Sequence, residues 1–144
     1  MISDSLQKTI NKLNKRRDEM FFYDGATDDQ ISDFEKANNI TLPAQFKEWL
    51  SYSDGGECYI PAGVQFYGVA HKPIIDVNCD NRPNENYIVI GTFPTGDPVL
   101  CEKNKNSISI FNLEDGRIEE DEVFPDFSRF LDALEELLGV DDET

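Results

Sequence analysis

Histidine, basic residues and long apolar runs are all scarce in this chain of 144 residues. No apolar stretch approaches the roughly 20 residues needed to span a bilayer. The first residues show neither the basic region nor the apolar region of a signal peptide. We therefore expect no membrane segment and a cytoplasmic location. His71 is the only histidine. A surface histidine is the simpler interpretation, because a catalytic base needs a nucleophile placed beside it.

Cysteine is also rare, since the sequence holds only Cys58, Cys79 and Cys101. An odd number of widely spaced cysteines argues against a disulfide framework and fits a reducing compartment. A structural zinc site needs paired ligands a few residues apart, and this spacing does not provide them. We expect three free thiols, no bound metal and no cofactor.

Two other kinds of site chemistry have little support. Residues 76–81 begin like a calcium-binding loop, but the sixth and twelfth positions hold Asn81 and Tyr87 where glycine and glutamate are needed. A polar surface loop is the simpler interpretation. Carboxylate pairs can hydrolyse glycosides, yet 29 acidic residues supply so many pairs that no single pair is informative. No phosphate-binding glycine loop occurs. We expect no enzymatic activity and no catalytic residue.

Positive charge is in short supply, because 13 basic residues face 29 acidic ones and the formal net charge is −16. Affinity for nucleic-acid phosphates depends on lysine and arginine, so we expect no nucleic-acid partner. The imbalance is uneven: residues 114–144 hold 13 acidic and 2 basic residues, a net charge of −11. A net charge of about 2–8 in magnitude serves the solubility of a small domain. The acidic last fifth of the chain therefore calls for another explanation.

The most informative stretch is a short helix with marked ends within residues 42–56. Pro43 suits the first helical turn, because its ring fixes φ and its missing N–H would have no intrahelical partner. Gly55 and Gly56 supply the left-handed backbone that ends a helix. We predict that the apolar face packs under a sheet and against the last helix, with Trp49 at its centre. The residues that form this face at helical spacing are Leu42, Phe46, Trp49 and Leu50.

This Leu-Pro to Gly-Gly stretch resembles the hallmark of the SUKH superfamily, whose domains are also called SMI1/KNR4-like. Residues 27–35 are similar to the helix that precedes the hallmark, and residues 91–100 are similar to the family's glycine-containing strand pair. The resemblance runs from about residue 27 to residue 138. Asp54 departs from the pattern, since an asparagine before the two glycines is commoner.

The resemblance implies a protein-binding function. Bacterial members are mostly immunity proteins of polymorphic toxin systems, and fungal members include a regulator of cell-wall synthesis. We expect a bacterial, cytoplasmic, monomeric immunity protein that neutralises a cognate protein toxin, such as a nuclease, by binding it directly. The alternative is a regulatory or scaffolding module of the same fold that acts on an endogenous protein partner.

The periodicity predicts an α+β fold in which helices pack on one face of an antiparallel sheet of about five to six strands. We expect one domain over residues 1–144, with an N-terminal helix and linker over 1–24 and an acidic tail over 140–144. The predicted helices are an N-terminal one over 3–17, one between a capping box at Thr27 and a stop at Asn39, the central Leu-Pro helix, and a C-terminal one over 126–138. The predicted strands cover residues 57–60, 64–69, 87–93, 99–103, 107–112 and 117–118, with a short one at 74–77.

The acidic run near the end of the sheet is the candidate partner-binding surface. A nuclease toxin needs a basic groove for phosphates, and carboxylates of a second protein can cover such a groove. The competing interpretation is a solvated strand edge, where charge deters pairing with another sheet. Both interpretations remain open at this point, and the loops around residues 78–86 are the next place to look. The candidate residues are Glu114, Asp115, Glu119, Glu120, Asp121 and Glu122.

Overall fold

The computed structural model describes residues 3–60, 63–71, 73–78, 80 and 82–138. Within these residues it has four α-helices and one antiparallel sheet of seven strands, which confirms the predicted α+β class. The helices are α1 (Asp4–Asn14), α2 (Asp28–Asn38), α3 (Ala44–Tyr52) and α4 (Phe127–Leu138), with a 3-10 turn at Arg17–Glu19. The strands are β1 (Met20–Phe21), β2 (Gly56–Cys58), β3 (Val64–Phe66), β4 (Tyr87–Thr92), β5 (Pro98–Glu102), β6 (Ile108–Asn112) and β7 (Arg117–Phe124).

The strands follow one another in chain order across the sheet, from β1 at one edge to β7 at the other. This is the predicted meander, with one more strand than the upper expectation of six. The additional strand is β1, whose Met20 pairs with Cys58 of β2. The short strand expected at residues 74–77 is instead a single parallel bridge between Gly68 and Ile74.

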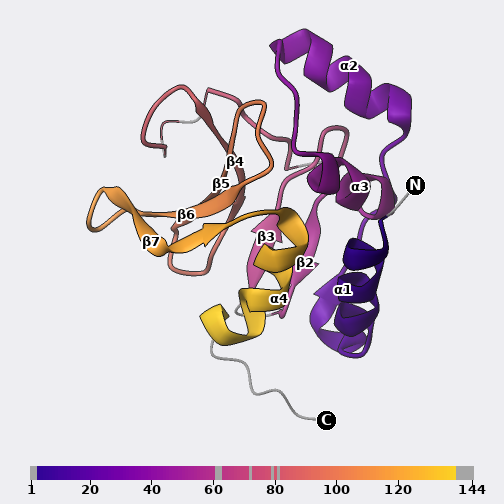
Figure 1. Ribbon diagram of the computed structural model, residues 1–144. Helices are drawn as coiled ribbons and strands as arrows, with labels where there is room; N and C mark the ends of the chain where they lie inside the picture. The colour runs from indigo at the N-terminus through magenta and orange to yellow at the C-terminus, as the bar shows by residue number, and fades with distance from the viewer. Residues whose placement is uncertain (1–2, 61–62, 72, 79, 81, 139–144) are drawn as a thin grey trace.

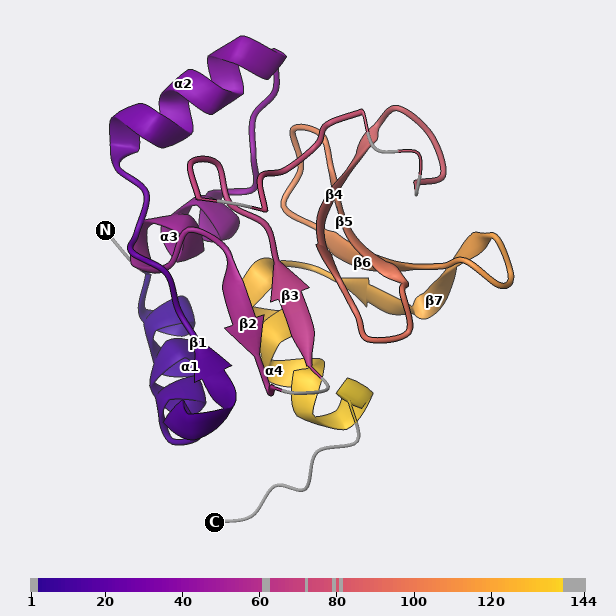
Figure 2. The same ribbon diagram turned by 180° about the vertical axis from the view of Figure 1, so that it is seen from behind.

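Helices α1, α3 and α4 lie on one face of the sheet: α4 is in front of β2 and β3 in Figure 1 and behind them in Figure 2, and α1 lies to the side of β2, over β1. The sheet twists strongly, so that β6 and β7 run across the direction of β2 and β3 in both views. Helix α2 stands apart from this layer and lies over α3. Ile31 is the buried residue of α2.

Local signals set most helix ends. Thr27 and Gln30 form the predicted capping box, in which each side chain accepts a hydrogen bond from the other's backbone N–H. Asn39 ends α2 in the left-handed conformation, with φ 54°. Asp126 caps α4 by accepting a hydrogen bond from the backbone N–H of Arg129 at 2.9 Å. Pro43 precedes the first turn of α3 as its N-cap, one position earlier than expected, because its extended ψ of 140° lies outside the helix.

The core prediction is confirmed, since Phe46 and Trp49 of α3 are buried against α4 and Trp49 also contacts the sheet. Trp49 is 0% exposed, and its ring contacts Phe66 of β3 and Phe127 of α4 at centroid distances of 5.9 and 5.8 Å. Phe46 meets Phe127 edge to face. A second, smaller apolar cluster involves Val89, Leu100 and Phe111, which alternate along their strands with residues of the main core.

Two of the three expected thiols lie in the described part of the chain. Cys58 and Cys101 are free and buried. Burial raises the pKa of the Cys101 thiol to about 12 and that of Cys58 higher still, so both are unreactive at neutral pH. Cys79 and the expected acidic tail over residues 140–144 lie outside the described residues. No described helix has the length and apolar content needed to cross a membrane.

Candidate functional site

The six acidic residues that the sequence singles out lie on the hairpin formed by β6 and β7, at the edge of the sheet far from α1 and α2 (Figure 1). Glu114 and Asp115 are exposed in the turn between the two strands. The other four lie on β7 itself, which the sequence predicted only for its first two residues. The structure therefore places the whole predicted set on one hairpin, where Glu119 and Glu122 are partly buried and the other four are exposed.

The acidic residues of β7 form a large bulge, in which four residues lie opposite one residue of β6. Ile118 pairs with Phe111 and Val123 pairs with Ser109, so Ile110 alone lies opposite residues 119–122. A bulge of this kind interrupts the ladder of hydrogen bonds and turns the bulged strand away from its neighbour. The side chains of residues 119–122 consequently leave the regular in-and-out alternation of a strand.

Negative charge is concentrated at the bulge. The pKa of Glu122 lies above its ordinary value because of partial burial, followed by the negative charges of Asp121, Glu119 and Asp97. Glu119 forms an ion pair with Arg117 at 3.3 Å. Among the described residues, no lysine or arginine forms an ion pair with the other three carboxylates, on Asp97, Asp121 and Glu122.

A hollow of about 280 Å³ lies beside this bulge, between the β4–β5 turn, β7 and the last turn of α4. Five apolar residues line it, together with Thr95 and two of these carboxylates, Asp97 and Glu122. Sequence reasoning missed the hollow, because its residues come from four separate parts of the chain, namely the β4–β5 turn, β6, β7 and α4. Those that matter below are Phe93, Pro94, Asp97, Ile110, Glu122 and Leu137.

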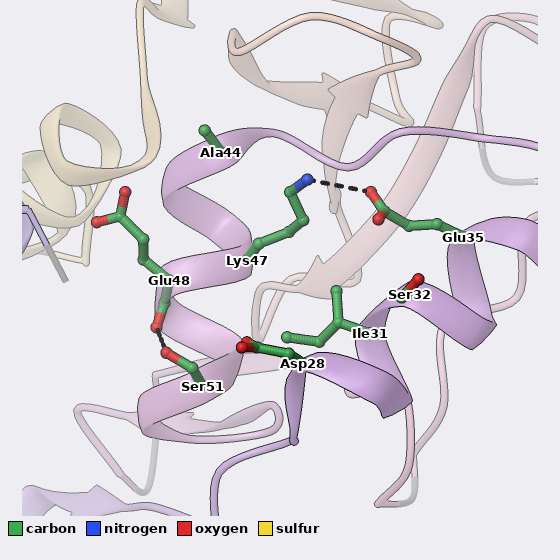
Figure 3. A pocket seen from close by; sticks show the side chains of 8 residues that line it. All are labelled: Asp28, Ile31, Ser32, Glu35, Ala44, Lys47, Glu48 and Ser51. Atoms are coloured by element: carbon green, nitrogen blue, oxygen red, sulfur yellow. Dashed lines mark hydrogen bonds and ion pairs between the residues drawn. The ribbon is translucent and has the colours of Figure 1, made fainter. Parts of the chain in front are cut away.

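A second hollow of about 320 Å³ separates α2 from α3, and Figure 3 shows its lining. Lys47 of α3 reaches across to Glu35 of α2, with an Nζ to Oε2 distance of 3.5 Å. The same Glu35 oxygen accepts a hydrogen bond from the backbone N–H of Leu42 at 2.7 Å. Glu48 accepts one from the backbone N–H of Ser3 at 2.6 Å. Two of the carboxylates of this groove are thus already engaged within the chain, and they hold α2 and residue 3 against α3.

Asp54 is the buried charged residue with the most hydrogen bonds. Its side chain is 0% exposed and accepts from the backbone N–H groups of Val69, Ala70 and His71 at 2.7 to 2.8 Å. The absence of a side chain at Gly68 is required here, because a Cβ would lie 2.7 Å from the Asp54 carboxylate. Asp54 therefore fastens the loop that follows β3 to the end of α3.

The one histidine takes part in this arrangement. The Nδ1 atom of His71 lies 3.0 Å from the Asp54 carboxylate, and its half-exposed ring stacks on Tyr23. His71 is partly exposed, as expected for a surface histidine, although sequence reasoning did not find its contact with Asp54. Within the described residues His71 has no hydrogen bond to a serine, threonine or cysteine side chain.

A comparison with protein families matches residues 25–133, more than half of the chain, to the SMI1 / KNR4 family (SUKH-1). The chain belongs to this family. A comparison with curated proteins finds no match. At the level of the family, membership of SUKH-1 supports a protein-binding, immunity-like module.

The SUKH-1 match begins before α2 and ends within α4, so it contains the β6–β7 hairpin, the bulge and Asp54. Helix α1 lies outside the match. Its apolar residues nevertheless belong to the main core, since Leu6, Ile10 and Leu13 are at most 1% exposed. In this member of SUKH-1, α1 therefore completes the same core that the family segment forms.

Proposed function

We propose that this SUKH-1 chain is a cytoplasmic immunity protein that binds a cognate protein toxin and does not catalyse a reaction. We propose further that residues 1–144 act as one domain and as a monomer. Family membership supports the protein-binding part of the proposal. The observation that carries the rest is the acidic bulge, where Asp121 and Glu122 lie on an exposed edge without an ion pair among the described residues.

The bulge suits a basic partner for an electrostatic reason. A nuclease must present lysines and arginines to phosphates, and a row of carboxylates on a second protein can occupy the same groove. Opposite fields also raise the rate of encounter, by up to about a thousandfold at low salt. Neutralisation then follows from occlusion, because the bound carboxylates exclude the nucleic acid.

Protection of the sheet edge against pairing with another sheet explains the acidic bulge less fully than binding of a basic partner does. β7 is the outer strand, so the competing interpretation applies to it. A bulge by itself twists an edge away from pairing. Four consecutive acidic residues within the bulge, at residues 119–122, are more charge than this task requires.

The first experiment removes the charge from the bulge. Glu119, Glu120 and Glu122 changed to Gln together with Asp121 changed to Asn should slow association with the toxin roughly tenfold or more at low salt. Where the gene beside the one for this chain encodes a secreted protein with a C-terminal toxin domain, that domain is the toxin used, and stopped-flow fluorescence measures its association. A matched control removes four exposed acids elsewhere, with Asn at positions 18, 24, 29 and 33, all of them Asp in this chain.

The expected result is slow association for the β7 variant and little change for the control, with both variants folded. Equal rates for the β7 variant and the unmodified chain would make the run a protected edge and direct the search to the loops around residues 78–86. A neighbouring gene for a large secreted protein with a C-terminal toxin domain supports immunity. An endogenous cellular partner instead supports the regulatory or scaffolding alternative.

A further inference from the structure

We propose that the hollow beside the β7 bulge receives the side chain of one lysine or arginine of the partner protein. This inference rests on the proposed function, because it assumes a protein partner. It adds the chemistry of one contact and locates it between the β4–β5 turn, β7 and the last turn of α4.

The size and walls of the hollow fit a long side chain. Its volume of about 280 Å³ is below the roughly 300–1,000 Å³ of small-molecule pockets. Phe93, Pro94, Ile110 and Leu137 give it apolar walls, and Leu137 is 37% exposed there. Lysine and arginine place their aliphatic stems on apolar surface and keep the charged group at its edge. The hollow offers both environments to one side chain.

Two acidic residues of the lining supply the negative charge that such a side chain needs. Asp97 and Glu122 both line the hollow, and the negative charge of Asp97 is one of the causes that raise the pKa of Glu122. Asp97 already accepts a hydrogen bond from the backbone N–H of Leu113 at 3.1 Å, which fixes its position. A guanidinium or ammonium group between the two carboxylates would relieve their repulsion and donate charge-assisted hydrogen bonds to them.

The groove between α2 and α3 is the weaker candidate for the same contact. Its Glu35 is paired with Lys47 and with a backbone N–H, and its Glu48 accepts the N–H of Ser3. A cation entering that groove would have to displace existing partners. In the hollow beside the bulge, the described residues supply no cation to displace.

The test uses small peptides as probes and the full chain labelled with ¹⁵N. Acetyl-Gly-Arg-Gly-amide is titrated against it, with the citrulline peptide as a neutral control of almost the same shape. We expect chemical-shift changes at residues 95–97 and 122–123 with the arginine peptide, and much smaller changes with the citrulline peptide. The double variant Asp97→Asn/Glu122→Gln should bind the arginine peptide roughly tenfold more weakly. Asp33→Asn, on the exposed face of α2, should bind it as the unmodified chain does.

Three outcomes would overturn the inference. They are equal shifts with both peptides, shifts spread over all acidic surfaces, and a dimer of the free chain that Glu122→Gln disrupts, since the occupant would then be a second copy. Failure of the proposed function looks different. In that case the arginine peptide still binds the hollow, but no toxin associates with the chain. Conversely, toxin association can depend on Glu119, Glu120 and Asp121 while the peptide does not bind. In that case the proposed acidic binding surface is kept and the proposal for the hollow is rejected.

Discussion

At the scale of single residues, Trp49 is the side chain on which the core depends most. It is fully buried and its ring meets four other aromatic rings, those of Phe22, Tyr52, Phe66 and Phe127. Its Nε1–H donates a hydrogen bond to the carbonyl oxygen of Gly55 at 3.1 Å, which ties the centre of α3 to the turn that follows it. The sequence could predict this role, because the apolar spacing of α3 and its terminal glycines are local signals.

We expect Trp49→Ala to lower the free energy of unfolding by about 3–5 kcal/mol, because truncation of a buried aromatic leaves a cavity that the neighbours fill only in part. Urea unfolding followed by circular dichroism measures this, since the variant has lost the only tryptophan. Trp49→Phe is the control and should lose clearly less, because much of the ring remains. An unchanged unfolding midpoint for Trp49→Ala would contradict the central place of this residue.

The hydrogen bonds of Asp54 are a single-residue feature that the sequence could not predict. In the sequence, Asp54 is marked only by its departure from the commoner asparagine. In the structure its carboxylate accepts three backbone N–H groups and lies beside His71. Those partners follow 15 to 17 residues later in the chain. Only the fold brings them together, and no local pattern in the sequence marks them.

At the scale of elements, the sequence predicted best where the end of an element has its own chemistry. The capping box of α2 is present as predicted, and α4 begins close to the predicted residue 126, where Asp126 caps it. Two strands, β1 and β7, were harder to predict from the sequence. β1 has two residues, too few for an alternating pattern, and β7 continues through acidic residues of low strand propensity. The pairing with β6 at both ends of the bulge extends β7 where its own sequence gives no sign of a strand.

The bulge of β7 is expected to reduce the stability of the fold at neutral pH. The pKa of Glu122 is higher in the folded chain than its ordinary value, so the native state binds more protons than the unfolded state between those two values. Stability therefore falls as the pH rises through this window and stays lower above it. Glu122→Gln should raise the melting temperature at pH 7 and change it much less at pH 4.

Thermal unfolding at the two pH values checks this, with Glu114→Gln as a control because Glu114 is exposed in the turn of the same hairpin. The control should leave the melting temperature nearly unchanged, as surface substitutions usually do. A lower melting temperature of Glu122→Gln at pH 7 would mean that Glu122 makes favourable contacts in the free protein. A stabilising change that also weakens partner binding would mark Glu122 as a residue kept for function.

At the scale of the whole molecule, the sequence predicted the family and the side of the protein that carries excess charge, but not the shape of the surface. The hollow depends on the β4–β5 turn, β7 and α4 meeting at one end of the sheet, and on a bulge that leaves Ile110 opposite four residues. Composition could locate the negative charge along the chain. It could not show that apolar walls lie next to it, because Phe93 and Leu137 are 44 residues apart in the sequence.

The net charge of −16 predicts opposite responses of folding and binding to salt. Salt shortens the Debye length from about 10 Å at 0.1 M to about 3 Å at 1 M. In the free chain, screening weakens the repulsion among carboxylates, so the melting temperature should rise by a few degrees from low salt to high salt. Association with a basic toxin should become slower over the same range, because screening also removes the attraction that speeds encounter.

Both quantities are measured on one preparation, by thermal unfolding and by stopped-flow association at each salt concentration. The β7 variant without charge at residues 119–122 should show a weaker salt dependence of association than the unmodified chain, because fewer carboxylates contribute to the attraction. The control variant with neutral residues at positions 18, 24, 29 and 33 has the same net charge as the β7 variant. It should keep more of the salt dependence of association. An equal loss in both variants would mean that total charge, and not the acidic hairpin, controls association.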